Sequence, residues 1–336
     1  MDSHMNNIAE LIYETYEKNK ELPRQHLGCS MLGDPCDRKL FISFRHAVAE
    51  SHPGRILKLF RFGHEYEDTA IRELREIGCK IINRQTNVDF GSFISGSTDG
   101  IIDGGLPGYE KERLLLEIKT HGDRSFKELV SKGVVLSKPV HHIQMVCYMY
   151  GLKLNRALYY AVNKNTSEIY TEIVEADDKL AEKYINRGKK IALSDYMPEP
   201  LSADPSWYQC RMCNYHDFCH NTKLTKEIHC RTCALSTANA DSTFTCSKYD
   251  NHKIEFEYQV QGCESHVLHP CLVPWERTES TKDFEAVYII DGQHVRNGEP
   301  DERVFSSKEI IADSSACARP DDVIDELREV FGAKII

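Results

Sequence analysis

One short segment of this chain constrains its fold more than any other, because charged and apolar side chains alternate along it. Residues 114–119 read Leu-Leu-Leu-Glu-Ile-Lys. Successive side chains of a strand point to opposite faces, so Glu117 and Lys119 share one face while Leu116 and Ile118 share the other. The segment therefore predicts a strand that carries a carboxylate beside an ammonium group, above an apolar underside.

A second acidic phrase precedes this segment, Gly-Ser-Thr-Asp-Gly at residues 96–100. We expect Asp99 to lie on the preceding strand, where its carboxylate completes a divalent-metal site with Glu117. Carboxylates that hold such an ion are the basis of metal-assisted hydrolysis of phosphodiester bonds. The two phrases together predict a metal-dependent hydrolytic site.

The composition is that of a soluble globular protein, with 41% hydrophobic and 28% charged residues in a chain of 336. No apolar run approaches the length that a membrane helix needs. Residues 1–4 resemble a cloning remnant before a native Met5, and the polar residues that follow lack the core of a signal peptide. We therefore expect a cytoplasmic protein that does not associate with membranes.

The net charge of −10 argues against a polycation that coats nucleic acid non-specifically. It is compatible with a nuclease, because metal-binding carboxylates add negative charge and a local basic groove can bind DNA. Basic residues cluster before residue 62, where they line such a groove or form a solvated helix face. They are Arg38, Lys39, Arg45, Arg55, Lys58 and Arg61.

Periodicity and turn signals give the expected order of elements. Helices are predicted at 6–19, 35–49, 54–77, 123–132, 139–151, 177–194 and 320–331. Strands are predicted at 80–90, 92–102, 113–120, 156–163, 167–174 and 286–290. The prolines at 197–200 mark a boundary before a cysteine-rich region.

The order of a helix, three strands, a helix and a strand, with Asp99 on the second strand and Glu117 and Lys119 on the third, resembles the PD-(D/E)XK nuclease superfamily. The resemblance implies an α/β (α+β) fold, in which helices flank a central mixed sheet. Asp103 is an alternative to Asp99, but the Gly-Ser-Thr-Asp-Gly phrase is similar to the turn by which this superfamily enters its site.

Two further features resemble the RecB-like branch of this superfamily, which includes CRISPR-associated nucleases. His64 lies on the long helix before the strands, where that branch has a metal-binding histidine. Gln144 and Tyr148 are four residues apart on one helix face, as in the Gln-x-x-x-Tyr pair that orients the DNA backbone and the site.

The resemblance implies a set of roles. His64, Asp99, Glu117 and the carbonyl of Ile118 would hold one or two Mg²⁺ or Mn²⁺ ions, and Lys119 would stabilise developing negative charge and position the attacking water. Three further acidic residues near His64 are candidates for a second metal or, more simply, solvated side chains. They are Glu65, Glu67 and Asp68.

Eight of the thirteen cysteines fall between residues 210 and 271, which in an intracellular chain indicates metal binding more than disulfides. Cys210, Cys213 and Cys219, with Cys36 far upstream, resemble the iron–sulfur RecB-type nucleases. That resemblance implies a 4Fe–4S cluster that ties the ends of the nuclease domain together. The alternatives are zinc, with His216 or His220 as a fourth ligand, and Cys29 in place of Cys36.

A second cysteine set predicts a structural zinc site, because two Cys-x-x-Cys/His knuckles flank a variable segment. The candidates are Cys230, Cys233, Cys246, Cys263 and His266, five ligands for four positions, with His252, His269 and Cys271 as further candidates. We accordingly expect a nuclease domain at 6–222, including the cysteine staple, and a zinc-binding module and tail at 223–336.

These features predict a divalent-metal-dependent DNA exonuclease that degrades single-stranded or duplex ends in recombination, repair or phage DNA processing. Tails with two knuckles on RecB-like nucleases resemble proteins of phage or prophage origin, which suggests a bacterial host cytoplasm. A homo-oligomer or a recombination partner protein is compatible with this role. The alternatives are a structure- or site-specific endonuclease, and a zinc-containing nucleic-acid-binding adaptor with an inactive nuclease core.

Overall fold

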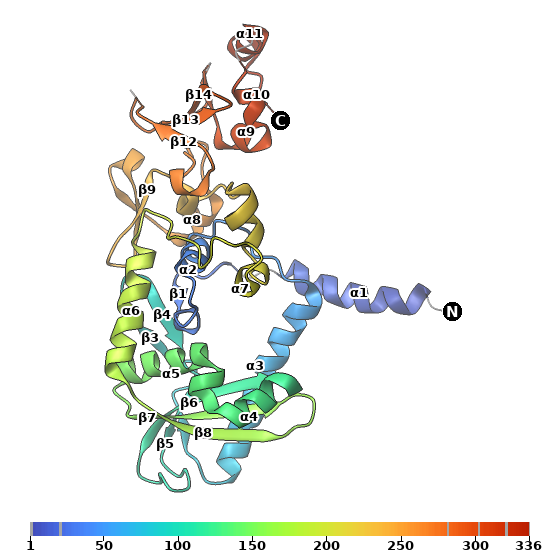
Figure 1. Ribbon diagram of the computed structural model, residues 1–336, viewed down its shortest axis with the longest axis vertical. Helices are drawn as coiled ribbons and strands as arrows, with labels where there is room; N and C mark the ends of the chain where they lie inside the picture. Colours follow the sequence, from blue (N-terminus) through green and yellow to red (C-terminus); the bar gives the residue numbers. More distant parts are fainter. Residues whose placement is uncertain (1–2, 20–21, 281, 302, 320–321, 336) are drawn as a thin grey trace. The chain divides into compact units, whose positions relative to one another are not determined.

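The computed structural model describes residues 3–19, 22–280, 282–301, 303–319 and 322–335, with helices and strands throughout (Figure 1). Contacts within the chain divide it into two units. The first unit takes in Met1–Asp34 and Glu50–Lys189, and the second takes in Pro35–Ala49 and Lys190–Ile336. This division differs from the predicted boundary after residue 222, which stays a prediction. The mixed α/β class is confirmed.

The helices of the first unit are α1 (Ser3–Lys18), α3 (Gly54–Glu76), α4 (Asp123–Ser137), α5 (Pro139–Leu152) and α6 (Asp178–Ala192), the last of which continues into the second unit. Its strands are β1 (Leu27–Gly28), β2 (Ile81–Ile82), β3 (Asn87–Asp89), β4 (Ile94–Ser97), β5 (Gly100–Asp103), β6 (Arg113–His121), β7 (Arg156–Asn163) and β8 (Ile169–Glu175).

A five-stranded mixed sheet forms the centre of the first unit, in the order β2-β5-β6-β7-β8. Strands β6 and β7 are parallel, and every other neighbouring pair is antiparallel. A second sheet of three short strands has the order β1-β4-β3. Each predicted strand before residue 103 is therefore split in two, and the halves of the second, β4 and β5, enter different sheets.

The predicted alternation along β6 is confirmed. Leu116 and Ile118 belong to a buried apolar cluster together with Ala70 and Leu74 of α3. On the opposite face of the sheet, His141 of α5 is hydrogen-bonded to Tyr159 of β7 at 2.8 Å. The sheet is therefore flanked by α3 on one face and by α5 on the other, which leaves the odd-numbered side chains of β6 for the site.

The second unit begins with the short helix α2 (Asp37–Phe44) and contains two further sheets. One is the antiparallel sheet of β9 (Ser236–Ala238), β10 (Phe244–Cys246) and β11 (His252–Ile254). The other joins β12 (Glu276–Thr278), β13 (Ala286–Ile290), β14 (Gln293–Asn297) and β15 (Val304–Phe305). Its remaining helices are α7 (Tyr208–Arg211), α8 (Phe256–Gln261), α9 (Ser307–Ala312), α10 (Ser314–Cys317) and α11 (Asp322–Phe331).

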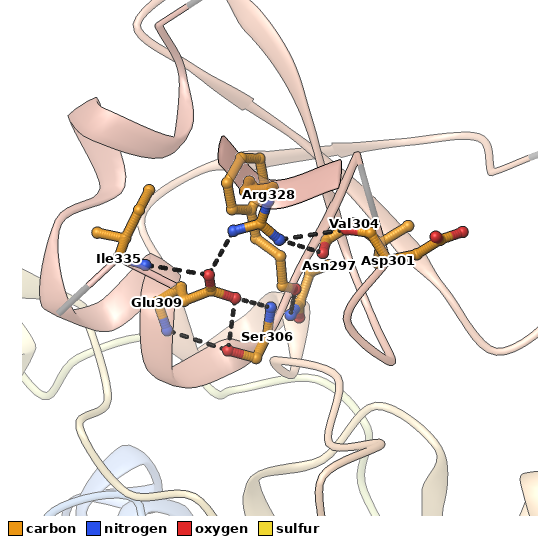
Figure 2. Close-up of polar contacts among 8 residues, drawn as sticks. Asn297, Asp301, Val304, Ser306, Glu309, Arg328 and Ile335 are labelled. Atoms are coloured by element: carbon orange, nitrogen blue, oxygen red, sulfur yellow. Dashed lines mark hydrogen bonds and ion pairs between the residues drawn. The ribbon is translucent and has the colours of Figure 1, made fainter. Parts of the chain in front are cut away.

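A buried ion pair joins the last helix to the rest of the second unit (Figure 2). Arg328 of α11 pairs with Glu309 of α9 and donates to the carbonyl of Val304 at 3.0 Å. Glu309 accepts from the N–H and the hydroxyl of Ser306, both at 2.9 Å. Within the described ranges, no helix is apolar over a length that would cross a membrane.

Candidate active site

The site is built on the odd-numbered face of β6. Glu117 is fully buried, and its carboxylate forms an ion pair with Lys119, whose side chain is 26% exposed. Beyond this ion pair, the Glu117 carboxylate accepts no hydrogen bond from any residue that the structure describes. A buried carboxylate with unused lone pairs suits a metal ion, because burial without a partner is costly.

Asp99 lies in the bend between β4 and β5, not within a strand as predicted. Its Oδ2 accepts a hydrogen bond of 2.7 Å from the backbone N–H of Ile118, which holds the carboxylate against β6. The alternative, Asp103, is the last residue of β5 and pairs at 2.8 Å with Arg113, the first residue of β6. The structure therefore brings Asp99, and not Asp103, to Glu117.

Helix α3 brings Glu67 to the site. Burial and the charge of Asp99 raise the pKa of Glu67, while His64 and Lys119 act in the opposite direction. His64 has a largely exposed side chain, and its Nδ1 lies 3.2 Å from Glu67 Oε1. Glu65 and Asp68 are engaged elsewhere, with Arg61 at 3.0 Å and Arg84 at 2.5 Å.

Glu67 is the functional candidate that the sequence analysis did not single out. It precedes the buried residues Ala70 and Ile71 by three and four positions, so it borders the buried face of α3. Glu67 alone of the three precedes two buried residues at these spacings, and its side chain is 15% exposed, against 63% for Glu65 and 68% for Asp68.

The electrostatics of the site are dominated by excess negative charge. Burial raises the pKa of Glu117 to about 7, with further contributions from Asp99 and Glu67 against the opposing effect of Lys119. Burial alone would lower the pKa of Lys119, but the three carboxylates outweigh it and raise the pKa. Three acidic groups around one ammonium group would be balanced by a divalent cation.

Among the residues that the structure describes, no group of three histidine, cysteine, aspartate or glutamate side chains is close enough together to hold a metal ion. Metal binding at this site would therefore require side-chain rearrangement. The donor chemistry nevertheless fits Mg²⁺ or Mn²⁺, which prefer carboxylate oxygens.

Gln144 and Tyr148 of α5 are both buried. Burial and the charges of Cys29, Glu117 and Asp99 raise the pKa of the Tyr148 phenol, and a hydrogen bond from Gln144 opposes this rise. The predicted pair therefore lies within electrostatic reach of the two carboxylates on β6 and the β4–β5 bend.

Two histidines and a tyrosine that the sequence pattern does not single out form a polar chain beyond Lys119. The ring of His121, two residues further along β6, lies 2.9 Å from the hydroxyl of Tyr159, and His141 of α5 lies 2.8 Å from the same hydroxyl. Burial, aided by nearby lysines, lowers the pKa of His121 to about 4 and that of His141 to about 3. Both rings are therefore neutral near pH 7.

Two of the predicted basic-groove residues belong to the second unit and are buried there. Arg38 donates to the carbonyl of Pro198 at 2.6 Å, and Arg45 donates to that of Ser194 at 2.9 Å and pairs with Asp195. Arg38 and Arg45 therefore support the second unit and do not line a DNA groove.

All members of the first cysteine set lie in the second unit. Three sulfur atoms accept hydrogen bonds: Cys36 from the N–H of Lys39 at 3.4 Å, Cys213 from that of Tyr215 at 3.5 Å, and Cys219 from Arg38 at 3.6 Å. Such donors stabilise thiolates, as a metal cluster requires. None of the thirteen cysteines forms a disulfide in the described ranges.

The second cysteine set encloses a cavity in the second unit. Cys230, Cys233, Cys246, Cys263 and His266 all line it. Burial raises the pKa of the Cys230 thiol to about 12, and the other three cysteines add to that rise.

Residues 8–220 match the family model of the PD-(D/E)XK nuclease superfamily. None of the curated proteins compared with the chain matches it. Among solved structures, it resembles an alkaline exonuclease from Laribacter hongkongensis, with 16% identity over 53% of this chain and 90% of that one, and a TM-score of 0.38. A phage-related exonuclease from Haemophilus somnus 129PT has 17% identity over 52% of this chain and 94% of that one, and a TM-score of 0.36.

Proposed function

Because the chain belongs to the PD-(D/E)XK nuclease superfamily, we propose that it hydrolyses phosphodiester bonds of DNA as a divalent-metal-dependent exonuclease. The observation that carries the proposal is the cluster of Asp99, Glu117 and Lys119, with Glu67 of α3 added to it. Such a site has carboxylates that can bind a metal ion and an ammonium group that can stabilise negative charge on a phosphate.

In this mechanism Asp99, Glu117, the Ile118 carbonyl and His64 would hold Mg²⁺ or Mn²⁺, and Glu67 would join the set. The chemistry that such an ion would supply is polarisation of the scissile phosphate and activation of a water as the nucleophile. Lys119 supplies a positive charge, because its raised pKa keeps it protonated beside Glu117. Its ammonium group stabilises the negative charge that develops on the phosphate.

The exonuclease assignment rests on Gln144 and Tyr148, which resemble the pair of end-dependent RecB-like enzymes and lie buried beside the site. The substrates would be single-stranded or duplex DNA ends, in recombination, repair or phage DNA processing in a bacterial cytoplasm. A homo-oligomer or a recombination partner protein would fit this role.

The first cysteine set is part of the proposal. Cys36, Cys210, Cys213 and Cys219 would hold a 4Fe–4S cluster, with zinc as the alternative, and the three donors to their sulfur atoms support either metal. Anaerobic purification followed by iron, sulfide and zinc analysis decides between them. Zinc without iron would exclude the cluster.

The function is tested with end-labelled linear DNA and covalently closed circular DNA, each with Mg²⁺, Mn²⁺ or a chelator. We expect metal-dependent degradation of linear DNA, sparing of circles, and loss of cleavage in Asp99→Asn but not in the matched control Asp103→Asn. Rapid cutting of circles would favour the endonuclease. Binding of DNA with no cleavage by the wild-type chain would favour the adaptor.

A further inference from the structure

The second unit contains a cavity whose wall is built from thiols. Four of its eleven lining residues are Cys230, Cys233, Cys246 and Cys263. They come from three separate parts of the chain: a turn before β9, the end of β10, and the loop after α8. The cavity volume is about 20 Å³, which accommodates one water-sized sphere.

We propose that Cys230, Cys233, Cys246 and Cys263 bind one structural zinc ion as a four-thiolate site, without His266. Four cysteine sulfurs around a single small cavity match the ligand number and chemistry of a closed zinc site. The proposal is independent of the nuclease function, because all its residues lie in the second unit.

The backbone at the first two ligands already has the form of a metal-binding knuckle. The N–H of Cys233 donates to the carbonyl of Cys230 at 3.2 Å, which closes a tight turn. The Cys233 sulfur accepts from the N–H groups of Leu235 at 3.5 Å and Val267 at 3.4 Å. Backbone donors to sulfur favour the thiolate that zinc needs.

His266 lacks a nitrogen available to a metal. Its Nε2 lies 3.2 Å from the hydroxyl of Thr232, and its Nδ1 lies 2.8 Å from that of Ser307. A zinc-binding histidine uses one nitrogen for the metal and one for a supporting partner. His266 lines the cavity, but both of its nitrogens already have hydroxyl partners, so it is not in the proposed ligand set.

The other candidates from the sequence face other partners. Cys271 donates its thiol to the carbonyl of Asp195 at 3.0 Å, and the His269 ring accepts from the Cys271 N–H at 3.2 Å. The His252 ring contacts the carbonyl of Tyr249 at 2.7 Å. None of these three is among the residues that line the cavity.

A lysine lies beside the proposed site. Four thiolates and one Zn²⁺ carry a net charge of about −2. Lys248 lines the same cavity, where its ammonium group donates to the Ser265 hydroxyl at 2.7 Å and also pairs with Glu299. As they stand, no three potential ligands among the described residues are arranged to hold a metal. Binding therefore requires the four thiols that line the cavity to come closer together.

Zinc content of the full chain tests the assignment. Cys246→Ser and Cys263→Ser are the variants of choice, because these two side chains are less buried than Cys233. Each should lose about one zinc per chain relative to wild type, as a closed four-ligand site requires. The matched control Cys271→Ser should keep it. Unchanged zinc in both variants, or the same loss in the control, would overturn the proposal.

Two measurements settle the ligand set. His266→Asn should retain the zinc that Cys246→Ser loses, and loss of zinc from His266→Asn in a folded chain would place the histidine in the ligand set.

Thiol alkylation of the wild-type chain, mapped by mass spectrometry, avoids variants that fail to fold. The four cysteines should be protected together and become reactive together on chelation. Alkylation of any one of them before chelation would contradict a four-thiolate site.

Discussion

The hydroxyl of Tyr148 occupies the space that a side chain at residue 96 would need. A Cβ atom built on Gly96 of β4 would lie 2.4 Å from Tyr148 Oη on α5. Tyr148 is only 2% exposed, so its ring can move away from the contact only by displacing its buried neighbours. A glycine in the acidic phrase is therefore required by the helix that carries the Gln-x-x-x-Tyr pair.

Gly96→Ala should destabilise the first unit by about 1–3 kcal/mol, the usual cost of overpacking a buried contact. It should also reduce nuclease activity, because Tyr148 must move. Urea unfolding and the cleavage assay measure the two effects. Gly63→Ala on α3 is the matched control, since a Cβ there meets no atom within 4 Å.

The double variant Gly96→Ala/Tyr148→Phe isolates the cause. Removing the hydroxyl removes the closest contact of the new Cβ, so much of the lost stability should return while activity stays low. A Gly96→Ala chain as stable and active as wild type would contradict the close approach.

Lys119→Met should affect both stability and activity. The substitution leaves the buried Glu117 carboxyl without its partner and favours its protonated form, which costs about 1–3 kcal/mol. It should also reduce cleavage about a hundredfold or more, because the charge on the phosphate loses its stabiliser. Lys111→Met, at an exposed lysine, is the control.

Adding Glu117→Gln to Lys119→Met should restore much of the stability, since no buried charge is left unpaired, but no activity. A double variant as unstable as the single one would show that the ion pair is not the reason for the loss.

Glu67→Gln should raise the Mg²⁺ or Mn²⁺ concentration needed for half-maximal cleavage by about tenfold or more, as expected for a residue near the metal. Glu65→Gln should leave that titration unchanged, because Glu65 pairs with Arg61 away from the site. If Glu67→Gln and Glu65→Gln need the same metal concentration for half-maximal cleavage, Glu67 does not belong to the site. If only His64→Asn raises that concentration, His64 is the metal ligand on α3.

The parts of the site that the sequence predicts are those that local patterns determine. The alternation at 114–119 fixes which face of β6 carries Glu117 and Lys119, and the four-residue spacing fixes one face for Gln144 and Tyr148. These patterns need no knowledge of distant contacts.

The parts that the sequence analysis missed depend on contacts between distant segments. Asp99 lies in a bend because β4 and β5 enter different sheets, which only the pairing of β4 with β1 and β3 reveals. The need for Gly96 likewise comes from Tyr148, on another element. The partners of His266 include Ser307, far along the chain, so this contact could not follow from the Cys-x-x-His spacing.

A final prediction concerns acid stability of the second unit, where Glu309 is buried beside Arg328 (Figure 2). Burial alone would raise the pKa of Glu309, but the hydrogen bonds from Ser306 and Arg328 outweigh it and lower the pKa. A depressed carboxyl pKa gives stability that is complete above the ordinary value of about 4.3 and is lost as the pH falls through the folded-state pKa.

Glu309→Gln should remove this acid dependence and destabilise the unit at neutral pH by about 3 kcal/mol, because the buried Arg328 loses its counter-charge. Trp275 packs against the apolar cluster of this unit, so its fluorescence in a Trp207→Phe background reports unfolding there. The urea midpoint of that background should fall as the pH drops below about 4, and the midpoint of its Glu309→Gln derivative should fall less steeply. Equal slopes in the two chains would show that Glu309 is not the group whose protonation limits stability in acid.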